Sequence, residues 1–243
     1  GEGMAEAIAE GMGGEMVSVG VSDPLGRKIE ANYALINGGA TAVIAMSSAS
    51  GLTLLKPEER NPLIASTFGT GELIVDALER GCREIIMGLG GSATNDCGVG
   101  MLRALGYRFY DAAGEELCDT ISILERVESI STAERHPLLM GVKFTAAVDV
   151  DNPLYGPQGA AHIFAPQKGA SPEMVERLDK ALRQYAEVVD ADAAEVAGAG
   201  AAGGMGYALY TMLGARMRPG IEIVLSLLDF ERRAQGASLV VTG

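Results

Sequence analysis

The chain has 243 residues and a net charge of −13, and 48% of its residues are hydrophobic while 21% are charged. This much apolar material excludes a disordered or low-complexity chain and is sufficient for a compact core. The acidic excess repels phosphate backbones and anionic lipid surfaces, so neither a nucleic acid nor a membrane is expected as a partner.

The cysteines indicate the cellular compartment, and the chain ends indicate that the sequence is a fragment. The three cysteines are odd in number and lack C-x-x-C spacing, which favours a reducing, cytoplasmic location over disulfides or a zinc site. No apolar run is long enough to cross a membrane. The chain opens on Gly1-Glu2-Gly3 and stops within an expected strand over residues 239–243, so we expect a piece of a longer protein.

The first elements in chain order are a helix and a hairpin. Residues 4–12 show helical spacing that ends at glycines. Residues 16–21 and 28–35 alternate on either side of Ser22-Asp23-Pro24-Leu25-Gly26, which predicts two antiparallel strands joined by a turn. A third strand is expected over residues 41–46.

The next elements predict alternation of helix and strand. A helix over residues 71–80 precedes residues 84–89, a continuous apolar run that is typical of a strand buried on both faces. A helix follows over residues 98–105, and another strand is expected over residues 142–148. This order predicts an α/β fold with a mixed sheet.

The last third of the chain is mainly helical. Residues 172–189 form the longest expected helix, with Ser171 as its N-cap and proline at its first position. Shorter helices are expected over residues 207–213 and 221–228, before the final strand.

The segment richest in chemistry is Gly88-Leu89-Gly90-Gly91-Ser92-Ala93-Thr94-Asn95-Asp96-Cys97-Gly98, which links a buried strand to a helix. Ligands of α/β proteins bind at this position, where glycine amides and a helix N-terminus attract anions. Asp96 would be a metal ligand or a base. The alternative is a glycine turn capped by Asn95 or Asp96. The candidate substrate- or phosphate-binding residues are Gly90, Gly91, Ser92, Thr94 and Asn95.

Two further segments carry candidate polar groups. Asp149-Val150-Asp151-Asn152-Pro153 follows a strand, and alternation would place Asp149 and Asp151 on one face, where they could hold Mg²⁺. An Asx turn is the alternative. Lys168 could meet an anionic substrate or phosphate, whereas a lone lysine is more often a solvated surface charge.

The string Gly198-Ala199-Gly200-Ala201-Ala202-Gly203 has the spelling of a dinucleotide-binding loop. Such a loop must follow a strand, and the residues before it are acidic and alanine-rich with helical character. This context argues against an NAD site. The chain also lacks a Walker loop, so a bound nucleotide would be held in another way.

Nine segments together resemble the bacterial type I glycerate kinase family. Each segment alone is weak, but they occur in the family's order over nearly the whole chain. They are Gly1-Glu2-Gly3, Ser22-Asp23-Pro24-Leu25-Gly26-Arg27, Ser50-Gly51-Leu52, Arg60-Asn61-Pro62-Leu63, Phe68-Gly69-Thr70-Gly71-Glu72-Leu73, Gly90-Gly91-Ser92-Ala93-Thr94-Asn95-Asp96, Asp149-Val150-Asp151-Asn152-Pro153-Leu154, Pro166-Gln167-Lys168-Gly169-Ala170 and Gly198-Ala199-Gly200-Ala201-Ala202-Gly203-Gly204.

The resemblance implies phosphorylation of D-glycerate by ATP, with Mg²⁺ and with 2-phosphoglycerate as the expected product. It also implies a cleft between two domains. Residues 14–220 would form an inserted α/β domain, and residues 1–13 and 221–243 would be remnants of a discontinuous Rossmann-like domain. A homodimer is left open. A non-catalytic ligand-binding or dimerisation fragment of such a kinase is the alternative.

Phosphoryl transfer requires positioning and neutralisation of charge, from which roles for individual residues are expected, and the chain departs from the family at two positions. Asp96, as the base near the glycerate hydroxyl, and Lys168 would be catalytic, and Asp149 and Asp151 would bind the metal. Ala45 stands where the family commonly has glutamate, and we expect reduced activity or altered substrate use if that carboxylate is functional. Cys97 stands where glycine is usual, a change that costs little unless the position requires a positive φ.

Overall fold

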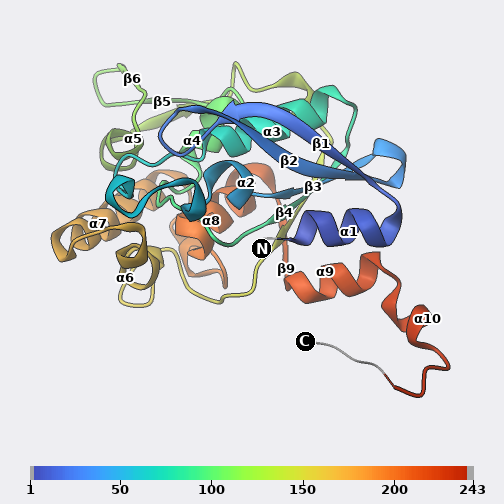
Figure 1. Ribbon diagram of the computed structural model, residues 1–243. Coiled ribbons are helices and arrows are strands. Elements are labelled where there is room, and N and C mark those ends of the chain that lie inside the picture. The colour runs from blue at the N-terminus through green and yellow to red at the C-terminus, as the bar shows by residue number, and fades with distance from the viewer. Residues whose placement is uncertain (1–2, 240–243) are drawn as a thin grey trace.

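A mixed six-stranded sheet forms the centre of the molecule in the computed structural model, which describes residues 3–239 (Figure 1). The strand order is β1-β2-β3-β4-β8-β9, with the first three strands antiparallel and the last four parallel. The mixed α/β sheet expected from the sequence is thus confirmed. The strands are β1 (Glu15–Ser22), β2 (Lys28–Ile36), β3 (Thr41–Ala45), β4 (Glu84–Gly88), β8 (Lys143–Ala147) and β9 (Arg216–Arg218).

The β1–β2 hairpin confirms the alternation in the sequence. Its turn is held by Asp23, which is 2% exposed and whose Oδ1 accepts hydrogen bonds from the backbone amides of Leu25 and Arg27 at 2.8 and 2.9 Å. Arg27 also pairs with the Asp23 carboxylate. The buried carboxylate therefore satisfies turn amides that the two strands leave free.

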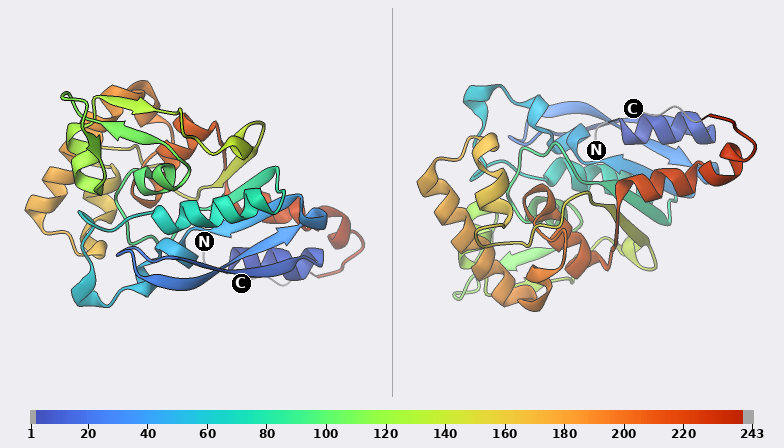
Figure 2. Two further views of the ribbon diagram at one scale, coloured as in Figure 1. Left: turned by 90° about the horizontal axis from the view of Figure 1, so that it is seen from above. Right: turned by 90° about the horizontal axis from the view of Figure 1, so that it is seen from below.

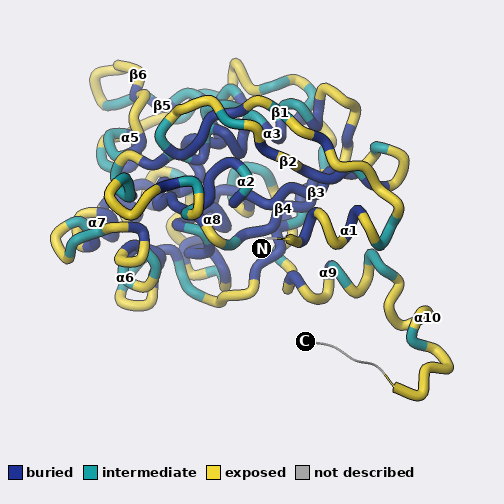
Figure 3. The backbone as a smooth tube through the Cα atoms, viewed as in Figure 1, coloured by how far each residue is buried: buried dark blue, intermediate teal, exposed yellow. Residues whose placement is uncertain are grey.

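The central strands are buried on both faces, as the continuous apolar run predicts. Ile86 of β4 faces a cluster with helices α1 (Met4–Met12) and α9 (Gly220–Leu227), whereas Ile85 and Met87 face the larger core on the other side. This division follows from the alternation of side chains along a strand. Figure 3 shows these strands buried, and the outer sides of α1 and α9 exposed.

Helices cover the sheet in two layers. The two further views show α1 and α9 packed side by side on one face (Figure 2). On the other side lie α3 (Phe68–Glu79), which starts earlier than the expected residue 71, and α4 (Val99–Ala104). Helix α2 (Ser47–Ser50) follows β3 and contacts β2 and α3. Helix α8 (Ala201–Leu213) contacts β8 and β9. None of the helices within residues 3–239 is long and apolar enough to cross a membrane.

A second, three-stranded antiparallel sheet was not expected from the sequence. Its order is β6-β5-β7, with bounds Glu116–Leu117, Arg108–Tyr110 and Ser129–Ser131. Strands of two or three residues are too short to show a period of two, which explains the omission.

Helix α5 (Thr120–Arg126) contacts β5 of this small sheet and packs on α7 (Pro172–Val189), and α7 also packs on α6 (Ala160–Phe164). The bounds of α7 match the expectation, and Ser171 Oγ accepts a hydrogen bond from the Met174 amide as its N-cap. A final helix, α10 (Phe230–Ala234), follows α9. The strand expected over residues 239–243 lies outside the described residues, apart from Leu239.

The expected domain boundaries fall within a packed region. Helix α1, before residue 14, and Ile223 of α9, after residue 220, share a hydrophobic cluster with Ile36 of β2. The division into an inserted domain and remnants of another therefore stays a prediction.

Candidate functional site

A cavity of about 150 Å³ lies where β4 and β8 end, at the carboxyl edge of the parallel strands. This edge is where open α/β sheets bind ligands. Five of the site residues expected from the sequence meet here. The cavity is lined by Leu89, Gly90, Gly91, Ser92, Asp149, Val150, Phe164, Gln167, Lys168, Ala201 and Ala202.

The loop after β4 is fixed by a neighbouring segment. Gly91 accepts a hydrogen bond from the Leu52 amide at 2.8 Å, and the Ala93 amide donates to Ser50 at 2.9 Å. Gly91 has φ +64°, which glycine adopts without strain. The backbone amides of Gly90 and Gly91 donate to no backbone carbonyl within residues 3–239. The loop thus offers donors to the cavity.

Lys168 is the buried cation of the site. It ends the short helix η5 (Pro166–Lys168) and is 2% exposed. Its Nζ lies 2.8 Å from Ser92 Oγ and donates to the backbone carbonyl of Thr94 at 2.6 Å. Burial lowers the pKa of Lys168 to about 7, against the opposing effect of the Asp96 charge. The interpretation of Lys168 as a solvated surface charge is therefore wrong.

Asp96 lies behind the cavity and has no exposed surface. Its carboxylate accepts hydrogen bonds from the Thr67 amide and hydroxyl at 2.8 and 2.7 Å, and from the amides of Gly98 and Gly100 at 3.1 and 3.2 Å. Burial nevertheless raises the pKa of Asp96. These four donors tie the starts of α3 and α4 together, which is a positioning role. Its role as a base stays a prediction.

Thr94 and Asn95 are also fully buried and do not line the cavity. Within residues 3–239, the Asn95 amide group and the Thr94 hydroxyl have no hydrogen-bond partner. A Cβ on Gly203 would lie 2.2 Å from the Thr94 carbonyl oxygen and 2.6 Å from Asn95 Cα. The glycine-rich start of α8 therefore packs directly against the loop after β4.

This second glycine-rich segment is the part of the site that the sequence reasoning missed. Ala201 and Ala202 line the cavity, and Ala202, Gly203 and Gly204 all have positive φ. The short helix η6 (Asp192–Glu195) precedes the segment, so the absence of the strand required for a dinucleotide loop is confirmed. The unusual run of small residues was the available signal.

Cys97 occupies a position that favours glycine. Its φ is +50°, and it is fully buried. Cβ crowding makes this region of φ costly for residues other than glycine. This position requires a positive φ, so cysteine in place of glycine is unfavourable here.

Of the two aspartates expected to bind metal, one lines the cavity and the other does not. Asp149 lines the cavity, and its Oδ1 accepts a hydrogen bond from the Gly220 amide at the start of α9, at 2.8 Å. Asp151 is exposed and does not line the cavity. Within the described part of the chain, no group of three or more His, Cys, Asp or Glu side chains could hold a metal ion.

Ala45 ends β3, where it pairs with Gly88 of β4. It lines a separate cavity of about 270 Å³ together with Glu6, Ser47 and Ser48. A carboxylate at this position would lie one strand away from the glycine loop. The effect of the missing glutamate stays a prediction.

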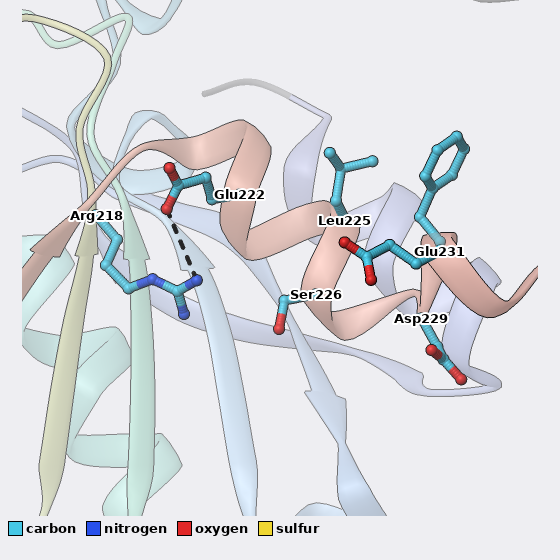
Figure 4. A pocket seen from close by; sticks show the side chains of 7 residues that line it. Arg218, Glu222, Leu225, Ser226, Asp229 and Glu231 are labelled. Atoms are coloured by element: carbon cyan, nitrogen blue, oxygen red, sulfur yellow. Dashed lines mark ion pairs between the residues drawn. The ribbon is translucent and has the colours of Figure 1, made fainter.

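A larger cavity, of about 640 Å³, lies away from these residues (Figure 4). Its walls are side chains of α9 and α10 together with Arg218, which pairs with Glu222 at 3.9 Å. It contains neither a glycine loop nor a buried lysine. We therefore place the candidate site in the smaller cavity.

Fold and site together define an α/β protein whose glycine-rich loops, buried lysine and carboxylate meet at the carboxyl edge of a mixed sheet, an arrangement typical of phosphate-binding sites. The chain belongs to the Glycerate kinase family, which it matches over residues 1–243. The family resemblance is thus confirmed.

Individual relatives agree with this membership. The chain is 44% identical to a glycerate kinase of Bacillus cereus and 45% identical to a glycerate 2-kinase of Escherichia coli. Each alignment covers 100% of this chain and 65% of the relative, so the chain spans about two thirds of the length of these proteins. A solved structure from Salmonella typhimurium LT2, provisionally named glycerate kinase 2, is 46% identical with a TM-score of 0.94 and covers 100% of this chain and 66% of its own.

Proposed function

We infer that the protein transfers the terminal phosphoryl group of ATP to D-glycerate, with Mg²⁺, and forms 2-phosphoglycerate. Family membership supports the reaction, and the name of the Escherichia coli relative supports the 2-position. The observation that carries the proposal is the buried Lys168 between two glycine-rich segments at the carboxyl edge of the sheet.

The cavity offers what phosphoryl transfer requires, which is mainly positioning and neutralisation of charge. The amides of Gly90 and Gly91 would contact phosphate oxygens, and Lys168 would compensate their charge when it is protonated. Ser92 supplies a hydroxyl beside Lys168. Thr94, Asn95 and Asp96 would support the loop from behind, because they are fully buried and do not line the cavity.

The donor set near Asp149 fits Mg²⁺. This ion is commonly bound through one or two carboxylates and the phosphates of the substrate, and retains several waters. Asp149 offers a hard oxygen in the cavity and is oriented by the Gly220 amide. Asp151 is the candidate for a second ligand. Bound Mg²⁺ would neutralise charge on the transferring phosphoryl group.

We propose a cytoplasmic location, with ATP and D-glycerate as small-molecule partners and neither nucleic acid nor membrane. The net charge of −13 supports the two exclusions. We retain the interdomain cleft, the inserted domain over residues 14–220 and the open choice of a homodimer as proposals.

The test is glycerate-dependent ADP release from Mg-ATP by the full chain, with the product identified by ³¹P and ¹³C NMR. We expect turnover with D-glycerate, 2-phosphoglycerate as product, and a loss of activity of about 10²-fold or more in Lys168→Met. Lys143→Met, which removes an exposed lysine on β8, is the matched control and keeps full activity. Glycerate binding without turnover would instead support the non-catalytic fragment.

A further inference from the structure

Ser92 and Lys168 form a close pair although they are 76 residues apart in the chain. Ser92 comes from the loop after β4, and Lys168 comes from η5. Their side chains are 2.8 Å apart, the residues are 5% and 2% exposed, and both line the cavity. A ligand in the cavity can therefore reach Ser92 Oγ while Lys168 Nζ lies directly beside it.

The surroundings of Lys168 favour its neutral form more than water does. Burial lowers its pKa to about 7, so a substantial fraction of the amine is unprotonated at neutral pH. Asp96 is the charged group that opposes this shift, and Asp149 lines the same cavity. The backbone of Arg60 packs against Gly169, the residue after Lys168.

The hydrogen bonds of the pair suit a neutral amine. Lys168 Nζ donates to the Thr94 carbonyl at 2.6 Å and to Ser92 Oγ at 2.8 Å, and its two N–H groups suffice for both bonds. Rotation of the Ser92 hydroxyl reverses the second bond, so that the lone pair of the neutral amine accepts the hydroxyl proton. Ser92 Oγ then keeps a lone pair that can accept a proton from a ligand in the cavity. The pair has the connectivity of a two-step proton path.

We propose that Ser92 and Lys168 form the proton relay of the reaction, in which Ser92 Oγ accepts the proton of the substrate hydroxyl and passes its own proton to Lys168 Nζ. The relay rests on the proposed function. The substrate oxygen forms a bond to the terminal phosphorus of ATP, and the bond from that phosphorus to the ADP oxygen breaks with its electron pair. The substrate hydroxyl loses its proton, and Lys168 gains one proton from Ser92. Lys168 then releases this proton to solvent after the product has left.

This assignment differs from the prediction that Asp96 is the base. A base must lie within hydrogen-bond reach of the proton that it accepts. Asp96 has no exposed surface, does not line the cavity and already accepts four hydrogen bonds. Ser92 does line the cavity. The relay therefore gives the substrate proton a path that the position of Asp96 does not provide.

The kinetic test compares variants of the full chain with Mg-ATP and D-glycerate. We expect Ser92→Ala to lower kcat by about 10²-fold or more with little change in the KM for ATP, and Ser92→Thr to restore most of the rate because it keeps the hydroxyl. Ser18→Ala is the control, since Ser18 is an exposed serine of β1 whose hydroxyl donates to Glu30 and which does not line the cavity. An unchanged kcat in Ser92→Ala would overturn the relay.

The pH dependence tests the second step. The wild-type kcat/KM should fall on the acid side with a midpoint near pH 7, and Lys168→Arg should lose this limb together with most of the rate, because a guanidinium cannot accept the proton. Persistence of the same limb in Lys168→Arg would overturn the assignment of Lys168.

NMR titration of the Lys168 side chain separates failure of the relay from failure of the proposed function, because it does not depend on turnover. We expect a midpoint near 7, displaced in Ser92→Ala. Normal turnover with Lys168 titrating near its ordinary value of 10.5 would overturn the relay alone. Absence of turnover in the wild-type chain, with the low midpoint present, would overturn the proposed function and the relay that rests on it.

Discussion

Asp96 binds Thr67 twice, through the backbone amide at 2.8 Å and through the hydroxyl at 2.7 Å. Thr67 stands at the start of α3, and its hydroxyl in turn accepts a hydrogen bond from the Met101 amide of α4 at 2.9 Å. This relationship connects two helix starts that are far apart in the chain. It also fixes the loop that carries Gly90, Gly91 and Ser92.

Asp96→Asn should destabilise the protein by about 2–4 kcal/mol, because an amide nitrogen would face donors that now bond a carboxylate. Chemical denaturation measures this loss. The matched control is Asp119→Asn, since Asp119 caps α5 by accepting one bond from Ser122, and asparagine caps equally well. Equal stability of the two variants would contradict the positioning role of Asp96.

Gly203→Ala should cost about 2–5 kcal/mol, from a positive φ and from overpacking together. Its φ is +72°, and an added Cβ would lie 2.2 Å from the Thr94 carbonyl oxygen. Gly214→Ala is the control, because Gly214 also has a positive φ, +63°, but an added Cβ would meet no atom within 4 Å. If both substitutions lowered the free energy of unfolding equally, close packing of the two loops would not be the cause.

Cys97→Gly should be more stable than Cys97→Ala by about 0.5–1 kcal/mol, because both variants remove the thiol and only glycine relieves the strain at φ +50°. Thermal and chemical denaturation of the two variants provide the comparison. A more stable alanine variant would show that backbone strain at this position is small.

The buried Lys168 should make stability depend on pH. Its pKa is about 7 in the folded chain and 10.5 when unperturbed, so between these values the unfolded chain binds more protons. The free energy of unfolding therefore gains from this group as pH rises, and the gain is lost as pH falls to about 7. Between pH 7 and 9, wild type should gain about 2 kcal/mol relative to Lys168→Met.

The difference between wild type and Lys168→Met removes the contributions of the other titrating groups. Lys143→Met removes an exposed lysine and keeps Lys168, so this variant should retain the rise in stability between pH 7 and 9. A constant difference between wild type and Lys168→Met from pH 7 to 9 would contradict the lowered pKa.

Asp149→Asn should raise the Mg²⁺ concentration required for half-maximal activity by about tenfold or more, because a carboxylate oxygen in the cavity is lost. Asp151→Asn should have a smaller effect, since Asp151 does not line the cavity. A Mg²⁺ titration of ADP release compares the two. A larger effect at Asp151 would show that the metal binds elsewhere.

Local patterns predicted the elements whose signals are contained in one stretch of chain. The hairpin followed from alternation around Asp23, and α7 followed from its N-cap and proline. Strand β4 followed from a continuous apolar run, which burial on both faces requires. The small sheet was missed because its strands are stabilised by partners distant in the sequence.

The sequence by itself determined the α/β fold, the family and the residue types of the site, because glycine loops, capping residues and alternating apolar positions act over a few neighbouring residues. Only the tertiary structure decided which polar groups share the cavity. Lys168 lines the cavity and Asp96 does not, although both were expected to be catalytic. Accessibility and pKa depend on atoms packed from distant segments, and those contacts form only when the chain folds.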